Sequence, residues 1–173
     1  MISFLKKHRI KAAVIMLVIG IVFISGCTHG QREASELICT LSVHCDTVLD
    51  NIGNLNPDKT EFVPQDGVIF PPTEVVFYEG ESVFDVLQRE MRQNKIHMEF
   101  VNTPIYNSAY IEGISNLYEF DCGNLSGWMY KVNDWYPNYG CSRYVLQNGD
   151  IVEWVYTCDL GRDIGGEGAV GSQ

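Results

Sequence analysis

An aromatic cluster interrupts the most strongly patterned stretch of this 173-residue chain. Trp135, Tyr136, Pro137, Asn138 and Tyr139 follow one another on a connection that is longer than a tight hairpin needs. Aromatic rings offer a large contact area and have few rotatable bonds. The cluster therefore predicts either a stacking surface for a flat ligand or an anchor for a protein partner. The alternative is a loop that folds back and covers the edge of its own sheet.

Six cysteines form a second group with chemical potential. Cys27 follows Ile24-Ser25-Gly26 at the end of an apolar run, which matches a bacterial lipobox, where the cysteine thiol receives a diacylglyceryl group. An uncleaved membrane anchor, or a secretory signal cut nearby, is the alternative. The other five cysteines cannot all pair, and many schemes are open. Because Cys122 and Cys141 flank the strand expected at residues 128–133, a bridge between them is the favoured first pair.

No recognisable signature of catalysis or metal binding appears elsewhere in the sequence. The four histidines are scattered, and none belongs to a Ser/His/Asp or Cys/His arrangement. There is no CxxC pair for a structural zinc site and no glycine-rich motif that would cradle a phosphate. We therefore expect no enzyme, no catalytic residues, no metal site and no resident cofactor.

The charge of the chain argues against nucleic acid as a partner. The net charge is −10, and residues 1–26 carry four basic and no acidic side chains, so their removal leaves −14. Nucleic-acid affinity comes largely from the neutralisation of phosphates by basic residues, which a strongly acidic chain cannot supply. The first 26 residues combine basic side chains with an apolar run and so predict a signal peptide.

The elements that must position the aromatic cluster follow from periodicity and turn residues. Residues 37–45 alternate between apolar and polar, which is typical of a half-buried strand. An apolar stripe at helical spacing predicts a helix over residues 83–94, with Ser82 and Asp85 as a capping box. Asn148-Gly149 predicts a tight turn. Further strands are expected at residues 74–78, 96–101, 128–133, 141–147 and 151–157, with short extended pieces at 110–114 and 117–120.

These elements predict one α+β domain with its helix on one face of a sheet. The expected organisation is a lipoprotein signal peptide at residues 1–26, a polar tether at 27–36, the domain at 37–160 and a Gly-rich, disordered tail at 161–173. Residues 46–73 are expected to form a long polar connection.

Four motifs in joint order resemble a known family. VFDVLQREM, YIEGISNLYEF, SGWMYKVNDWYPNYG and LQNGDIVEWVYT look like the transcobalamin-like C-terminal domain of bacterial lipoproteins, which is similar to the small domain of the animal cobalamin carriers. The resemblance covers most of residues 75–158. It implies a β-grasp-like mixed sheet crossed by a single helix. Since the first and last strands of such a sheet are parallel neighbours, it also implies a second bridge, between Cys45 and Cys158.

In the animal carriers this domain closes over cobalamin against a larger helical domain. The resemblance implies that the ligand-binding residues are Trp135, Tyr136, Asn138, Tyr139 and Tyr144. The expected function is a binding protein, anchored by lipid to the outer face of the cytoplasmic membrane at the bacterial cell surface, with cobalamin or another corrinoid as its ligand. The alternative is a surface protein-interaction or adhesion module that has no small-molecule ligand.

Overall fold

The structure is a computed structural model that describes residues 36–104 and 107–169. The expected signal peptide, the lipidation at Cys27 and all of the tether except its last residue lie outside the described residues. Within the described ranges, no helix has both the length and the apolar character that a membrane span requires.

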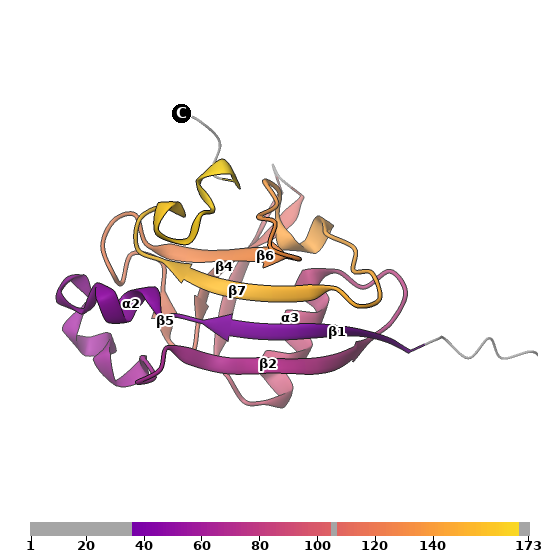
Figure 1. Ribbon diagram of the computed structural model, residues 1–173, viewed down its shortest axis with the longest axis horizontal. Helices are drawn as coiled ribbons and strands as arrows, with labels where there is room; N and C mark the ends of the chain where they lie inside the picture. Colours follow the sequence, from indigo (N-terminus) through magenta and orange to yellow (C-terminus); the bar gives the residue numbers. More distant parts are fainter. Residues whose placement is uncertain (1–35, 105–106, 170–173) are drawn as a thin grey trace, which may run out of the picture. The chain divides into compact units, whose positions relative to one another are not determined.

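Four strands form a mixed sheet in the order β2-β1-β7-β6 (Figure 1). The central strands β1 and β7 run parallel, with Leu41 opposite Val152 and Val43 opposite Trp154. Both outer strands pair antiparallel with their neighbours. This parallel central pair confirms the predicted α+β fold with a β-grasp-like mixed sheet. The strands are β1 (Leu37–His44), β2 (Val68–Phe77), β6 (Gly127–Val132) and β7 (Ile151–Thr157).

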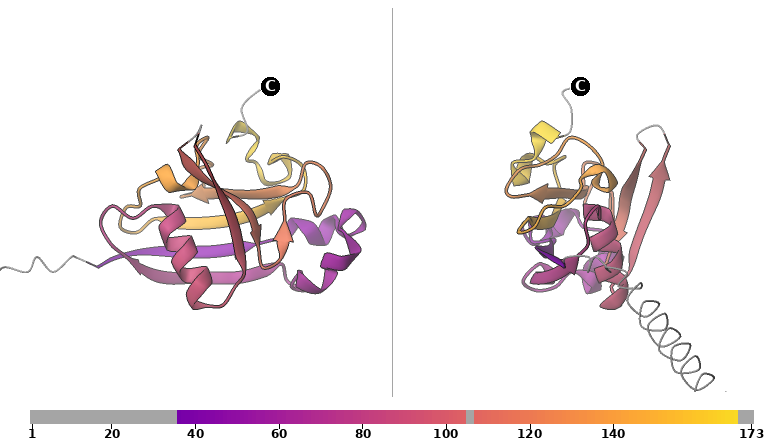
Figure 2. Two further views of the ribbon diagram at one scale, coloured as in Figure 1. Left: turned by 180° about the vertical axis from the view of Figure 1, so that it is seen from behind. Right: turned by 90° about the vertical axis from the view of Figure 1, so that its right-hand side faces the viewer.

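A second layer covers one face of this sheet, as the rear view in Figure 2 shows. It consists of helix α3 (Val83–Gln93) and a small antiparallel sheet of β3 (Met98–Thr103), β4 (Ser108–Ile114) and β5 (Leu117–Tyr118). The predicted capping box of α3 is confirmed: Ser82 N donates to Asp85 Oδ2 at 2.8 Å, and Asp85 N donates to Ser82 Oγ at 3.3 Å. The remaining helices are short: α2 (Thr47–Asp50) and the 3₁₀ helices η1 (Ile52–Asn54), η2 (Pro57–Phe62), η3 (Cys141–Arg143), η4 (Arg162–Ile164) and η5 (Glu167–Ala169).

The hydrophobic core lies between the two layers. On β6 and β7 the large aromatic side chains face each other in register, Trp128 opposite Tyr156 and Tyr130 opposite Trp154, and all four are buried. Trp128 Nε1 donates to the carbonyl oxygen of Leu117 at 2.9 Å, and Tyr156 Oη donates to that of Tyr118 at 2.7 Å. Their polar ends therefore join the main sheet to β5, while their rings exclude water from the interior.

The strand predicted at residues 141–147 is wrong. Residues 141–143 form η3, and the extended run behind it bonds to the start of α3 instead of to β6. Val83 N donates to Tyr144 O, and Leu146 N donates to Glu81 O, each at 3.0 Å. Because these partners lie far away in sequence, the local alternation of residues 141–147 could not reveal them.

The boundaries of two other segments differ from the prediction. Strand β2 begins at Val68, within the expected polar connection, and passes through Pro71-Pro72. Prolines are tolerated there because β2 is an edge strand, where a missing N–H breaks no ladder. The tail is ordered up to Ala169, which corrects the expected disorder: Gly161 N donates to Thr157 Oγ1 at 2.7 Å and Cys158 N to Asp163 Oδ2 at 2.7 Å.

Candidate functional site

A cavity of about 680 Å³ lies where the two layers meet the aromatic loop and the C-terminal tail. The main sheet contributes Trp128, Tyr130 and Trp154 to its wall, and strand β4 contributes residues 108–111. Leu160 closes it from the tail side. Its size and its largely apolar, aromatic wall are those of a site for a small organic ligand. We call it the aromatic cavity.

A single charged residue, Arg143, lines the aromatic cavity among the residues that the structure describes. Its guanidinium carbon lies 5.8 Å from the centre of the Tyr139 ring, a cation–π distance. The absence of carboxylates from the described wall is notable in a chain of net charge −10. The cavity therefore favours a neutral or anionic ligand over a cationic one.

Trp154 adds an unsatisfied donor to this wall. Its side chain is only 2% exposed, and Nε1 has no hydrogen-bond partner within the described part of the chain. Buried donors are nearly always paired, because an unpaired one has lost its bonds to water. The neighbouring Trp128 shows the ordinary arrangement, since its Nε1 reaches a carbonyl oxygen.

The five predicted ligand-binding residues do not all lie in one place. Asn138 and Tyr139 line the aromatic cavity. Tyr144 stacks on Tyr139, with ring centres 6.3 Å apart and an interplanar angle of 17°. Trp135 packs edge-on against Tyr139 at 6.1 Å and is 52% exposed. Tyr136 is half-buried near the tail, where a side chain at Gly166 would meet its ring. The loop thus forms a ladder of rings over the cavity, of which Trp135 is the part that faces solvent.

A small residue and two hydrogen bonds from or to side chains hold this loop against β4 and β6. Ala109 N donates to Ser142 Oγ at 3.0 Å, and Tyr130 Oη donates to the carbonyl oxygen of Tyr139 at 2.8 Å. Gly140 is so close to Ser108 that an added Cβ would lie 1.8 Å from Oγ of that serine. The position of the loop against β4 therefore depends on the absence of a side chain at position 140.

Several residues of this wall carry no distinctive signal in the sequence. Trp128 and Trp154, at inward positions of β6 and β7, belong to the core and also line the cavity. Arg143 was not singled out. The signal that could have indicated the site is the series of large aromatic residues at successive inward positions of two paired strands. Large, rigid rings are hard to pack together without leaving a cavity between them.

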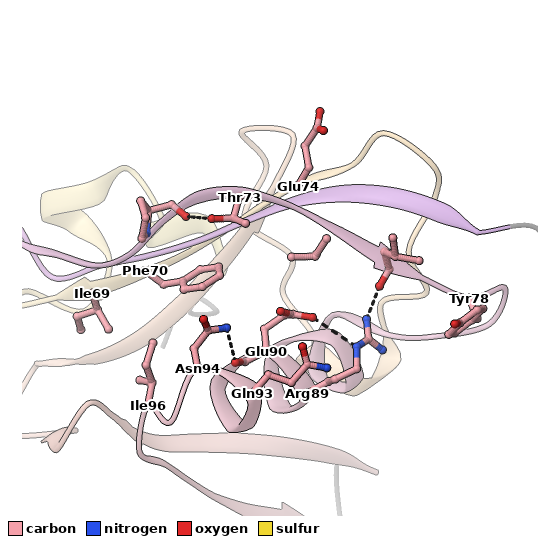
Figure 3. A pocket seen from close by; sticks show the side chains of 13 residues that line it. Ile69, Phe70, Thr73, Glu74, Tyr78, Arg89, Glu90, Gln93, Asn94 and Ile96 are labelled. Carbon is pink, nitrogen blue, oxygen red and sulfur yellow. Dashed lines mark hydrogen bonds and ion pairs between the residues drawn. The ribbon is translucent and has the colours of Figure 1, made fainter.

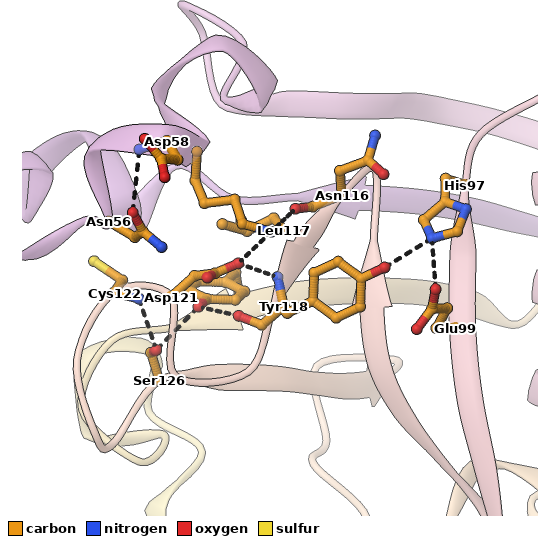
Figure 4. A network of polar contacts seen from close by, with 12 residues as sticks. Asn56, Asp58, His97, Glu99, Asn116, Leu117, Tyr118, Asp121, Cys122 and Ser126 are labelled. Carbon is orange, nitrogen blue, oxygen red and sulfur yellow. Dashed lines mark hydrogen bonds and ion pairs between the residues drawn. The ribbon is translucent and has the colours of Figure 1, made fainter.

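A polar network anchors the turn that forms one end of the cavity (Figure 4). Asp121 Oδ2 accepts from Tyr118 N at 2.7 Å and lies 3.3 Å from Lys59 Nζ. Tyr118 Oη lies 2.8 Å from His97 Nε2, which also contacts Glu99. These contacts fix β5 and the start of the turn, whose later residues 124–126 line the cavity. The His97 imidazole is partly exposed, and its contacts described here are to Glu99 and Tyr118.

A second, larger groove of about 950 Å³ runs between β2 and α3 (Figure 3). Two of its polar side chains, Arg89 and Asn94, already bond to the protein itself. Arg89 Nη2 donates to the carbonyl oxygen of Val76 at 2.6 Å, and Asn94 Nδ2 donates to that of Glu90 at 2.9 Å. We prefer the smaller aromatic cavity as the candidate site, because its wall is richer in aromatic rings and holds a donor without a partner.

The five described cysteines are unbridged in this structure, and the expected pairs Cys122–Cys141 and Cys45–Cys158 stay predictions. The Cys141 thiol donates to the carbonyl oxygen of Ala109 at 3.6 Å, on the β4 side of the core. Cys122 lies at the other end of β6, where its thiol donates to the carbonyl oxygen of Asn51 at 3.6 Å. Flanking the same strand does not bring two residues together, because the strand itself holds them apart.

Burial of three thiols predicts a loss of stability in alkali. Burial is the main cause that raises the pKa of Cys39 to about 11 and the pKa of Cys45 and Cys141 to about 12, from an ordinary value of 9.0. The contribution of these protonated thiols to the free energy of unfolding is complete below pH 9.0. It is lost as the pH rises from there toward 11–12, because the thiols of the unfolded chain release their protons at a lower pH than those of the folded protein.

Urea unfolding followed by circular dichroism at a series of pH values tests this prediction. Each thiol is expected to remove up to about 1.4 kcal/mol of unfolding free energy per pH unit in that window. Cys45→Ala is expected to make the unfolding free energy fall less steeply with rising pH, whatever the substitution does to stability at neutral pH. An identical slope in the variant and the parent would contradict the assignment.

Comparisons with known proteins agree with this fold. Residues 80–158 match a family described as a domain of unknown function, DUF4430. Haptocorrin, in its crystal structure in complex with Cbi, superposes with a TM-score of 0.53 at 17% identity, over 79% of this chain and 29% of haptocorrin. A proposed metal-binding protein from Ruminococcus gnavus gives a TM-score of 0.38 at 15% identity, over 70% of this chain and 95% of that one. None of the curated proteins matches this sequence.

The chain therefore has a fold like that of part of haptocorrin, of which it spans less than a third. The Ruminococcus gnavus likeness is too weak to support an argument about function. Within residues 36–104 and 107–169 no group of three or more His, Cys, Asp or Glu side chains is arranged to hold a metal ion.

Proposed function

We propose that this chain is a lipid-anchored extracytoplasmic binding protein that holds a corrinoid, such as cobalamin, at the aromatic cavity. The observation that carries the proposal is the ring ladder over an apolar, aromatic cavity that has one cation and no carboxylate among its described lining residues. The likeness to a cobalamin carrier supports the choice of ligand class. The lipobox ending at Cys27 supports the location.

The chemistry of a corrinoid suits this surface. Its flat macrocycle can stack on an exposed ring; Trp135, which is 52% exposed and packs on the partly buried Tyr139, presents such a ring. The macrocycle is edged with amide side chains, which are neutral and are small enough to enter a cavity of about 680 Å³. An amide carbonyl is also the kind of acceptor that the Trp154 N–H lacks. In this arrangement the ring remains at the loop surface, and only its substituents enter the protein.

Titration of purified residues 28–173 with cobalamin tests the proposal. We expect heat in calorimetry and quenching of tryptophan fluorescence, since all three tryptophans lie at the cavity or on its loop. Tyr139→Ala is expected to weaken binding about tenfold or more, because it removes the middle ring of the ladder. Tyr78→Ala is the matched control, since Tyr78 is a 48% exposed tyrosine that lines the other groove, and it should bind like the parent.

The outcome that would end the corrinoid proposal is the absence of both heat and quenching at high micromolar cobalamin. Equal weakening by Tyr139→Ala and Tyr78→Ala would keep a corrinoid ligand but move it away from the aromatic cavity.

One observation favours the alternative, a surface module that binds proteins. The open face of the main sheet carries three exposed apolar side chains at neighbouring positions. Ile38 on β1 lies opposite Val76 on β2, and Ile151 on β7 lies opposite Thr40, two residues after Ile38 on β1. Such patches often mark protein contacts. If this face binds a partner, Ile38→Ser with Ile151→Ser should abolish recovery of that partner, whereas Tyr139→Ala should leave it unchanged.

A further inference from the structure

Two of the free thiols lie together at one end of the aromatic cavity. Cys122 stands in the turn after β5, and Cys158 directly follows β7. Both sulfur atoms approach the same turn of chain around α2. Cys122 Sγ lies 3.6 Å from the carbonyl oxygen of Asn51, and Cys158 Sγ lies 3.9 Å from Thr47 Oγ1. Asn51 and Thr47 are themselves joined by a side-chain hydrogen bond of 2.8 Å.

The two thiols are also close enough for each to affect the pKa of the other. Burial is the main cause that raises the pKa of Cys122 and of Cys158; the neighbouring thiol partly offsets this for Cys122, whose pKa it lowers, and raises the pKa of Cys158 further. No such thiol neighbour acts on the pKa of Cys39, Cys45 or Cys141. The turn that carries Cys122 is held next to β7, because Leu160 N donates to the carbonyl oxygen of Leu125 at 2.8 Å.

We propose that Cys122 and Cys158 form a disulfide bond, which fastens the turn at residues 122–126 to the end of β7. Cys158 is partly exposed whereas Cys122 is 2% exposed, so Cys158 is the thiol that an oxidant reaches first. The oxidant is an external disulfide, such as oxidised glutathione or an oxidised thiol–disulfide oxidoreductase. The location outside the cytoplasmic membrane, on which this oxidation in the cell rests, is part of the proposed function.

The reaction is an ordinary thiol–disulfide exchange in two steps. The Cys158 thiolate attacks the external disulfide, forms a mixed disulfide and releases one thiol. The Cys122 thiolate then attacks Cys158 Sγ in the mixed disulfide and releases the second thiol. The protein loses two protons and two electrons, and the oxidant gains them as two thiols. Because burial raises the pKa of both cysteines, the exchange should accelerate as the pH rises.

The bridge would join the two segments that form this end of the cavity. Leu125 and Ser126 follow Cys122 and line the cavity, while Thr157 and Leu160 flank Cys158 and line it from the tail side. Oxidation would therefore add a covalent bond where hydrogen bonds join the segments, from Leu160 N to the carbonyl oxygen of Leu125 and from Tyr156 Oη to Ser126 Oγ. The bridge would also restrict the unfolded chain, which is the main way in which disulfides stabilise proteins.

Tryptic peptide mapping of residues 28–173 after incubation with oxidised glutathione tests the pairing without any ligand. Cleavage after Lys95, Lys131, Arg143 and Arg162 places Cys122, Cys141 and Cys158 in the separate peptides 96–131, 132–143 and 144–162. Free thiols are first blocked at acidic pH to stop exchange. We expect a linked pair of peptides 96–131 and 144–162 that disappears on reduction, while peptide 132–143 is recovered alkylated.

The control variant is Cys141→Ala, which should keep the linked pair. Reduction is expected to lower the melting temperature of the parent by roughly 10 °C and to leave Cys122→Ser/Cys158→Ser unaffected. Recovery of both Cys122 and Cys158 as alkylated thiols, or linkage of either to another cysteine, would overturn the proposal. The parent map decides the question even if the double variant fails to fold. A linked pair in a protein that shows no heat with cobalamin would reject the corrinoid and retain the bridge.

Discussion

Gly140→Ala is expected to destabilise the domain by about 1–3 kcal/mol, the usual cost of forcing extra volume into a packed interior. The new Cβ would lie 1.8 Å from Ser108 Oγ and 2.4 Å from Ser108 Cβ. Rotation of the hydroxyl could relieve the first contact but not the second, so the loop or β4 must move. Gly140 and Ser108 both line the aromatic cavity, and the same shift should change its shape.

Urea unfolding followed by circular dichroism measures this loss. Gly53→Ala is the matched control, because no atom lies within 4 Å of its added Cβ, and it should change the stability by less than about 0.5 kcal/mol. Ser108→Gly introduced together with Gly140→Ala removes the obstructing side chain and should recover part of the loss. A Gly140→Ala protein as stable as the parent would mean that the loop does not sit against β4 as described.

Trp128→Phe is expected to cost more stability than Trp154→Phe, by about 1–2 kcal/mol. Both substitutions remove similar buried area from paired strands of the same sheet. Only Trp128 donates from Nε1, to the carbonyl oxygen of Leu117, and its replacement leaves that acceptor without this donor. Trp154 Nε1 has no partner in the described chain, so its replacement relieves a buried donor.

The two variants are compared by the same unfolding measurement, and each serves as the control for the other. Far-UV circular dichroism of the folded state would first establish that both keep the native sheet. Equal losses of stability, or a larger loss for Trp154→Phe, would show that Trp154 Nε1 has a hydrogen-bond partner in solution. It would then not be a free donor for a ligand.

The elements with a strong local signal could be predicted from the sequence. Alternation over residues 37–45 indicated β1, and its inward residues Cys39, Leu41 and Val43 are buried as a half-buried strand requires. Ser82, Asp85 and the apolar stripe behind them indicated α3 together with its cap. In each case the bonds or contacts that define the element join residues only a few positions apart, or repeat with the period of the element itself.

The errors lie where the partner is remote. Residues 141–147 have the alternation of a strand, yet their backbone bonds go to Glu81 and Val83, which no local pattern indicates. The cysteine next to Cys122 is Cys158 and not Cys141, because the end of β7 returns beside the turn after β5. Both errors came from treating closeness in sequence as closeness in space.

By itself, the sequence determined the aromatic composition of the loop, the apolar and polar faces of the strands and the acidity of the domain, since these are properties of residue type and spacing. Only the tertiary structure decided which rings meet. It set Tyr139 between Trp135 and Tyr144, left Trp154 Nε1 without an acceptor and enclosed the cavity between β4, the main sheet and the tail. A cavity is the space that remains after segments from distant parts of the chain have packed, so its walls are a property of that packing and of no single segment.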